Sequence, residues 1–160
     1  MTTRRPRQVP LVSTARIQWT AYSKRLEARA VLAYGQDFLT TGRKAGSLLV
    51  RAYLVGHGLE LLFKSYLLHS GLRPTQLKHI GHKLTKLLAE CTKHGLASIV
   101  TISPQLVSDV TLFDAVYAAK RLEYFSLLDM LSPPRIPDLA RTQQFAAKLS
   151  KALDKALPHP

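Results

Sequence analysis

His57, Glu60 and Lys64 are the first residues whose types and spacing suggest chemistry. Steps of three and four residues place their side chains on one flank of a helix. As a site, the three would line a polar groove in which His57 moves protons near neutral pH. As part of a scaffold, Glu60 and Lys64 would form an ion pair within the helix, with His57 at the edge of the core. No second acid or nucleophile accompanies them, which favours the scaffold.

A second candidate is the start of a predicted helix at Gly81-His82-Lys83-Leu84. Backbone amides at a helix start lack partners within the helix, so together with the charge of Lys83 they would suit an anion such as phosphate. His82 has an equally good structural interpretation, in which it caps or buttresses the turn that precedes the helix. The sequence leaves both interpretations open.

The third candidate lies late in another predicted helix, where Tyr117, Lys120, Arg121 and Tyr124 share one face. Arginine beside tyrosines suits a nucleic acid, because the guanidinium binds phosphate and the rings stack on bases. The alternative is that both tyrosines pack into the core while the two cations bury their stems and reach water.

Metal and cofactor chemistry has little support in the sequence. His79 and His82 have no cysteine pair nearby, and Cys91 stands alone among the apolar positions of a predicted helix, where it fits as a small buried residue. The patterns GxxxxGK[ST], GxGxxG, HExxH and GxSxG are absent. The sequence therefore predicts no metal site and no cofactor.

The elements that must position these residues are helices. Apolar residues recur at steps of three and four, and only the short stretch 97–102 resembles a strand. In the first helix the predicted apolar stripe comprises Trp19, Tyr22, Leu26, Ala30 and Ala33. The predicted fold is all-α, an up-and-down bundle of four to five helices, with a basic arm at 1–13 and a single helical domain at 14–157. The expected helices cover about 14–39, 45–69, 82–95, 103–124 and 137–157.

Positive charge dominates the composition. The chain has 160 residues, with 23 Lys and Arg against 10 Asp and Glu, and a formal net charge of +13. Such a surface attracts anionic partners, and RNA is a common one because binding releases counterions from the phosphates. An acidic protein partner would serve equally, and a basic surface also keeps a protein soluble.

No run of about 18 apolar residues is present, because Arg51, His57, Glu60 and Lys64 interrupt the longest one. The first residues, MTTRRPRQVP, are not followed by the apolar core of a signal peptide. With one cysteine, Cys91, no internal disulfide can form. These features predict a cytoplasmic protein without membrane association.

Three segments together resemble the HEPN superfamily of small helical domains, found in prokaryotic toxin, defence and nucleotidyltransferase-linked systems. They read GHGLELLFKSYLLHSG, GHKLTKLLAEC and YAAKRLEYF, within about residues 48–125. The resemblance rests on Glu60 and Lys64, on Gly81-His82, and on Arg121 with Tyr124. It implies a helical domain, a homodimer, and a role in a toxin-antitoxin or defence system.

Many members of that family are metal-independent ribonucleases that use an Arg and a His about four to six residues apart, for the phosphate and the ribose hydroxyl respectively. No histidine follows Arg121 at that distance. Arg51 and His57 have suitable spacing, but they lie in an earlier helix, about 120° apart around its axis. They remain weak catalytic candidates.

The leading hypothesis is therefore a non-catalytic HEPN-like domain that binds RNA or another anionic ligand. Its expected ligand-binding residues are His57, Glu60, Lys64, His82, Lys83, Arg121 and Tyr124. The alternatives are an endoribonuclease toxin using Arg51 and His57, and an interaction module that docks an acidic protein.

Overall fold

The computed structural model describes residues 21–122, 131–132 and 135–157. The predicted basic arm at 1–13, the start of the first predicted helix and Tyr124 lie outside these residues. The described ranges contain helices and no strand, so the all-α prediction is confirmed. The elements are α1 (Ala21–Lys44), α2 (Leu48–His69), α3 (Pro74–Ile80), α4 (Leu84–Lys93), the 3-10 helix η1 (Leu96–Ser98), α5 (Pro104–Tyr117) and α7 (Leu139–Ala156).

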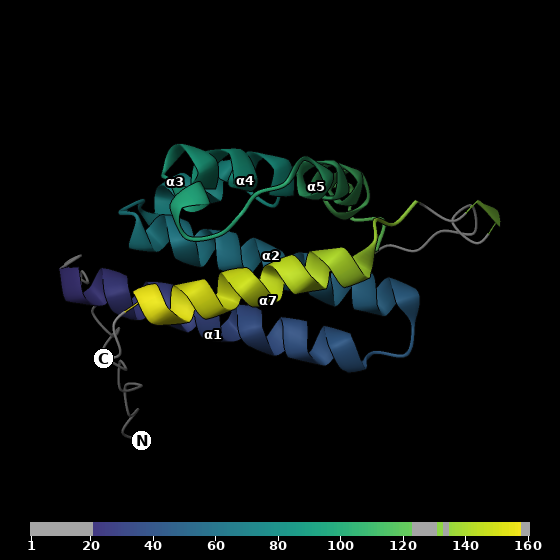
Figure 1. Cartoon of the computed structure of the whole chain (residues 1–160), viewed down its shortest axis with the longest axis horizontal. Helices are drawn as coiled ribbons and strands as arrows, with labels where there is room; N and C mark the ends of the chain where they lie inside the picture. The colour runs from purple at the N-terminus through teal and green to yellow at the C-terminus, as the bar shows by residue number, and fades with distance from the viewer. Residues whose placement is uncertain (1–20, 123–130, 133–134, 158–160) are drawn as a thin grey trace, which may run out of the picture.

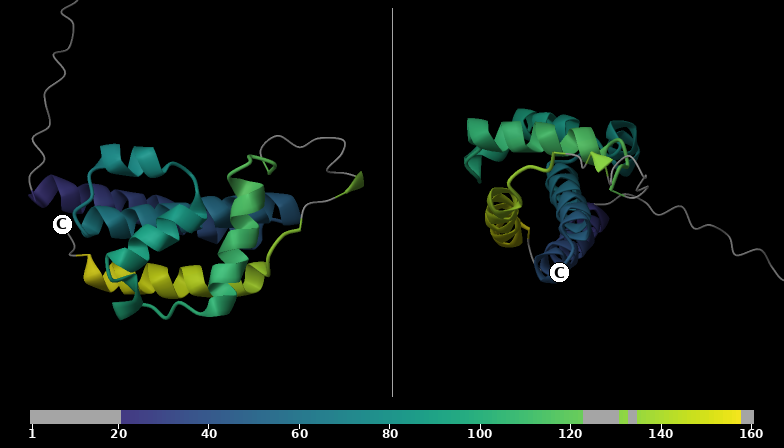
Figure 2. Two further views of the ribbon diagram at one scale, coloured as in Figure 1. Left: turned by 90° about the horizontal axis from the view of Figure 1, so that it is seen from above. Right: turned by 90° about the vertical axis from the view of Figure 1, so that its right-hand side faces the viewer.

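The long helices α1, α2 and α7 run side by side, and α3, α4 and α5 lie over α2 on its other side (Figure 1). Seen from above, α4 and α5 cross the long helices instead of continuing an up-and-down order (Figure 2). Helix α2 lies between the layers and packs against α1, α4 and α7. Its Leu59, Leu62 and Phe63 have no exposed surface, as the sequence predicted for a helix deep in the core.

The predicted apolar stripe of α1 was wrong, because Leu26, Ala30 and Ala33 are exposed and the buried face carries Ala28 and Leu32. Two glycines explain which face turns inward. A Cβ added at Gly58 would lie 2.7 Å from Leu39 Cγ and 3.1 Å from the Gly35 carbonyl oxygen. The helices α1 and α2 therefore approach too closely for larger side chains, and this contact fixes the rotation of α1.

Several predicted boundaries also differ. The stop expected at Thr40-Thr41-Gly42 is wrong, since α1 continues to Lys44 and Gly42 lies inside the helix against Leu54 and Val55. The expected loop after Ser70 contains α3, and η1, which begins at Leu96, covers the first two residues of the strand-like stretch 97–102.

The helix predicted to carry Arg121 ends earlier, at Tyr117. Lys120 has a positive φ of 57°, which no α-helix accommodates. Other terminal signals were correct: Ser103 caps α5 by accepting a hydrogen bond from the Leu106 amide at 3.2 Å, with Pro104 in the first turn.

No helix within the described ranges is long and apolar enough to cross a membrane.

Candidate functional site

Glu60 is the centre of a group of polar side chains that joins three helical segments. It lies on α2 with 1% of its surface exposed. Its two carboxylate oxygens have hydrogen-bond partners from α2, from α5 and from the turn before α4. The Tyr117 hydroxyl at the end of α5 donates to Oε2 at 2.6 Å, and Lys64 Nζ donates to Oε1. His82 Nδ1, in the turn before α4, lies 3.0 and 3.2 Å from the two oxygens. These four residues and His57 are called the Glu60 cluster.

His57 occupies the partly exposed edge of this cluster, with 25% of its side chain accessible. Its Nδ1 lies 2.9 Å from the Tyr117 oxygen and 3.7 Å from Glu60 Oε2. Because the Tyr117 proton goes to Glu60, the Tyr117 oxygen must accept from His57 Nδ1–H. The ring also stacks parallel to Tyr53 at 6.1 Å and meets Phe38 edge-on at 4.5 Å. These contacts fix the orientation of the imidazole.

The charge on Glu60 is permanent at neutral pH. Burial raises the pKa of this carboxyl group, but the nearby His57 imidazole, hydrogen bonds from Lys64 and Tyr117, and the charge of Lys64 outweigh it and lower the pKa from 4.5 to about 2. A general base needs a pKa nearer the working pH. The geometry therefore makes Glu60 an anchor for α4 and α5 and a poor proton acceptor.

The backbone donors at the start of α4 already have a partner within the chain. The Leu84 amide donates to Asp114 Oδ1 at 2.8 Å, and the Thr85 amide lies 3.4 Å from Asp114 Oδ2. The Thr85 hydroxyl donates to the same carboxylate. Asp114 of α5 thus occupies the position that the sequence suggested for an external anion, and Lys83 beside it is exposed.

Arg51 and His57 have separate surroundings. The Arg51 guanidinium donates through Nε and Nη2 to the Ala45 carbonyl oxygen, at 3.2 and 2.8 Å, in the link between α1 and α2. His57 points instead toward Tyr117. The two weak catalytic candidates therefore share no partner in these contacts.

Arg121 is exposed beyond the end of α5, where its amide donates to the Val116 carbonyl at 3.1 Å. Tyr124 lies outside the described residues, so its expected position on the same helical face stays a prediction. Tyr117, the other aromatic residue of that predicted face, is buried in the Glu60 cluster.

A hollow of about 340 Å³ borders the cluster, and its lining includes Lys64, Lys78, His82 and Glu27. Burial raises the pKa of Glu27, whose Oε2 is buried without a hydrogen-bond partner among the described residues. With Glu60 bound to Lys64 and His82, the carboxylates offset the cations of this hollow. Neither His57 nor Arg121 lines it, so these two expected ligand-binding residues do not share this hollow with Lys64 and His82.

The exposed surface of α3, of the following turn and of the first turn of α4 carries cations without nearby carboxylates in the sequence, unlike the hollow. Residues 73–86 contain no Asp or Glu, and six basic or imidazole side chains there are exposed. No ion pair involves Lys78, Lys83 or Lys86 within the part of the chain that the structure describes. We call this surface the basic segment; it comprises Arg73, Lys78, His79, His82, Lys83 and Lys86.

Within the described ranges, no three His, Cys, Asp or Glu side chains are grouped as a metal site. Cys91 is fully buried with its Sγ 3.6 Å from the Phe63 carbonyl oxygen, and burial raises the pKa of its thiol. This environment suits a core residue and disfavours a thiolate nucleophile.

No protein-family model, curated protein or solved structure matches the chain. Its fold and its side-chain geometry are therefore the basis for a functional proposal. They define an all-α protein with a buried, internally paired polar cluster and an exposed basic segment.

Proposed function

We propose that the protein is a non-catalytic, HEPN-like helical domain that binds single-stranded RNA through the basic segment. The observation that carries the proposal is the run of exposed cations at 73–86 without a carboxylate among them. Cations free of intramolecular ion pairs neutralise phosphates and release counterions, which drives association. The basic segment contributes more of this charge than the Glu60 cluster, where Lys64 is already paired.

RNA is favoured over an acidic protein by the imidazoles. His79 and His82 are exposed beside Lys78 and Lys83, and ring side chains next to cations can stack on unpaired bases while the cations bind the backbone. An acidic protein surface would use the charges but would leave these rings without a stacking partner. The proposal therefore specifies unpaired bases.

The absence of catalysis in this proposal rests on the Glu60 cluster. A nuclease acting through His57 would need the imidazole and a cation to converge on one phosphodiester. The Arg51 guanidinium instead binds the Ala45 carbonyl, and His57 Nδ1 is held by Tyr117. These contacts support a structural role for both.

The test is fluorescence anisotropy with a labelled, mixed-sequence single-stranded RNA at low salt. A K78Q/K83Q/K86Q variant should bind at least tenfold more weakly than wild type. The matched control is K148Q/K151Q/K155Q, which removes three exposed lysines from α7 and should change affinity by less than about threefold. Equal losses of RNA affinity in both variants would assign the binding to net charge and contradict the proposal.

The same preparations separate the alternatives. RNA that stays full length after incubation supports a non-catalytic domain, whereas cleavage that is lost in His57→Ala would support an endoribonuclease. No RNA affinity at low salt, together with co-purification of an acidic protein, would support an interaction module.

A homodimer is part of this proposal. The exposed face of α1 supports it, because Leu26 and Tyr34 are 39% and 64% exposed and lie beside the exposed Ala30 and Ala33. Light scattering should give the mass of two chains, and of one chain for Leu26→Glu. A single-chain mass for the wild type at every concentration measured would contradict the dimer.

A further inference from the structure

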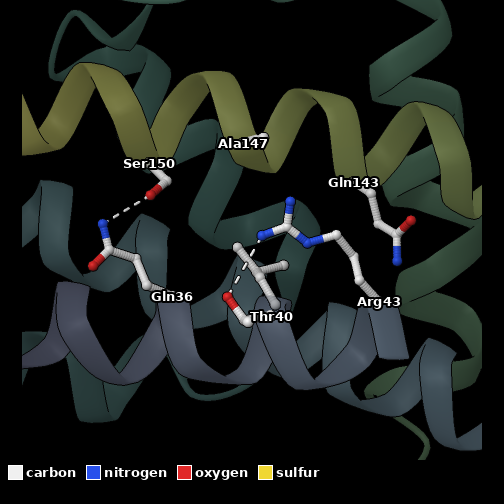
Figure 3. A pocket seen from close by; sticks show the side chains of 7 residues that line it. Gln36, Thr40, Arg43, Gln143, Ala147 and Ser150 are labelled. Carbon is white, nitrogen blue, oxygen red and sulfur yellow. Dashed lines mark hydrogen bonds between the residues drawn. The ribbon is translucent and has the colours of Figure 1, made fainter. Parts of the chain in front are cut away.

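A pocket between α1 and α7 lies apart from the Glu60 cluster and the basic segment. Its volume is about 260 Å³, and both helices contribute to it (Figure 3). Helix α1 provides Gln36, Thr40 and Arg43, and α7 provides Gln143, Ala147 and Ser150, while the buried Leu39 completes the lining. The positions follow steps of four and three on each helix, so two matching helical faces form the two walls.

Three polar side chains of this pocket carry hydrogen-bond donors. Gln143 Nε2 is buried and has no hydrogen-bond partner among the described residues. Gln36 Nε2 donates to the Ser150 oxygen at 3.0 Å, which leaves the Ser150 hydroxyl proton free to donate. The Arg43 guanidinium extends into the space between the helices and makes a long 3.5 Å contact with Thr40 Oγ1 (Figure 3). A buried donor without a partner costs stability, which a ligand would recover.

The positive charge of the pocket lining favours an anionic ligand. Among the described residues that line it, Arg43 is the one ionised side chain and none is a carboxylate. Asp154, one helical turn beyond Ser150, is bound by Arg29 with 3.0 Å between Nη2 and Oδ1. Asp37 follows Gln36 on α1 but is not part of the lining. A set of donors around one guanidinium matches the oxygens of an anion.

The size of the pocket limits the ligand to a small molecule. Pockets for drug-sized ligands begin at about 300 Å³. A volume of about 260 Å³ therefore suits a compact molecule and excludes a folded partner. Ala147 has a small side chain on the wall above Arg43, which keeps this space open (Figure 3).

We infer that the α1–α7 pocket binds a small oxyanion, a phosphate or carboxylate group, held by Arg43 with Gln143 as a neutral donor. This site goes beyond the proposed RNA binding, because it uses different helices and a ligand of a different size. Arg43 supplies the charge, and the Gln143 amide supplies a donor that is otherwise unpaired.

The experiment is an NMR titration of the ¹⁵N-labelled full chain with sodium phosphate, and separately with sodium acetate, at constant ionic strength. The Gln143 side-chain amide and Arg43 Nε–H signals should shift and saturate with a dissociation constant of about 1–10 mM, as expected for so few ligand atoms. Saturation with phosphate alone, acetate alone or both supports the site and identifies the group. Saturation with neither overturns it.

The variants make the assignment specific. Arg43→Gln should weaken binding at least tenfold, and Gln143→Met, which keeps the volume but removes the donor, about threefold to tenfold. Arg25→Gln removes an exposed charge from the same helix outside the pocket and should bind as wild type does. Unchanged affinity for the oxyanion in both Arg43→Gln and Gln143→Met would overturn the inference. The K78Q/K83Q/K86Q variant should still bind the oxyanion, whether or not it has lost RNA binding.

Discussion

The Glu60 cluster and the basic segment place the same kinds of side chain in opposite environments. In the cluster, a carboxylate with 1% exposure holds a lysine, a histidine and a tyrosine from three helical segments. In the basic segment, the lysines are exposed and form no ion pair among the described residues. Removing one partner of a buried pair strongly destabilises a fold, whereas exposed and unpaired charge attracts ions and partners of opposite sign.

His82 belongs to both regions. Its Nδ1 binds Glu60, yet 63% of its side chain is exposed. It therefore links the position of the basic segment to the buried carboxylate. Variants of the cluster should change stability first, and variants of the basic segment should change association.

Glu60→Gln should give the largest loss of stability. The change removes the charge that compensates Lys64, whose side chain is only 18% exposed, and it weakens the bonds to Tyr117 and His82. Breaking a buried pair from one side predicts a loss of about 3 kcal/mol in the free energy of unfolding, measured by urea denaturation.

Glu90→Gln is the matched control for that change. It removes a carboxylate from α4 that pairs with Lys93 at 3.1 Å on the surface, and it should leave the urea midpoint nearly unchanged. If the two variants behaved alike, the cluster would not be the structural anchor.

Acidification should remove the same contribution from the wild type. The pKa of Glu60 is lowered from 4.5 to about 2, so its contribution is complete above pH 4.5 and disappears as the pH falls toward 2. This lowering of the pKa corresponds to about 3 kcal/mol in the free energy of unfolding. Urea unfolding at several pH values should therefore show the gap between wild type and Glu60→Gln constant above pH 5 and narrowing below pH 4. A gap that stayed constant to pH 2.5 would contradict the low pKa.

Tyr117→Phe should have a smaller effect. The ring, which lies against Phe113 with 6.3 Å between centroids, stays in place, but the hydroxyl that donates to Glu60 is lost. A loss of about 1–2 kcal/mol in urea denaturation is expected. Tyr34→Phe, at an exposed position on α1, should change stability by less than about 0.5 kcal/mol. If Tyr117→Phe lost no more stability than this control, the Tyr117 hydroxyl would not contribute to the stability of the cluster.

Local signals in the sequence predicted much of the fold. The deep burial of α2 followed from its apolar stripe, and the start of α5 followed from Ser103 and Pro104. The rotation of α1 did not follow, because two faces of the helix carry apolar residues. The choice between them depends on the contact of Gly35 with Gly58, which no local pattern contains.

The candidate site shows the same division. His57, Glu60 and Lys64 could be placed on one flank of a helix from their spacing alone. The partners of these residues come from α5 and could not be predicted. Tyr117 binds Glu60 across 57 residues of sequence, and Asp114 binds the Leu84 amide at the start of α4 across 30 residues. Polar residues at helical spacing in α1 and α7 were a usable signal for the α1–α7 pocket, although only the fold shows that the two faces meet.

We propose that the basic segment binds RNA while the Glu60 cluster maintains the fold. The most direct measurement is the dependence of RNA affinity on salt for wild type and for K78Q/K83Q/K86Q. With about 0.7 counterion released per phosphate contact on a single strand, losing three contacts should reduce the slope of log K against log salt by about 2. An unchanged slope in this variant, with a reduced slope in K148Q/K151Q/K155Q, would contradict the account.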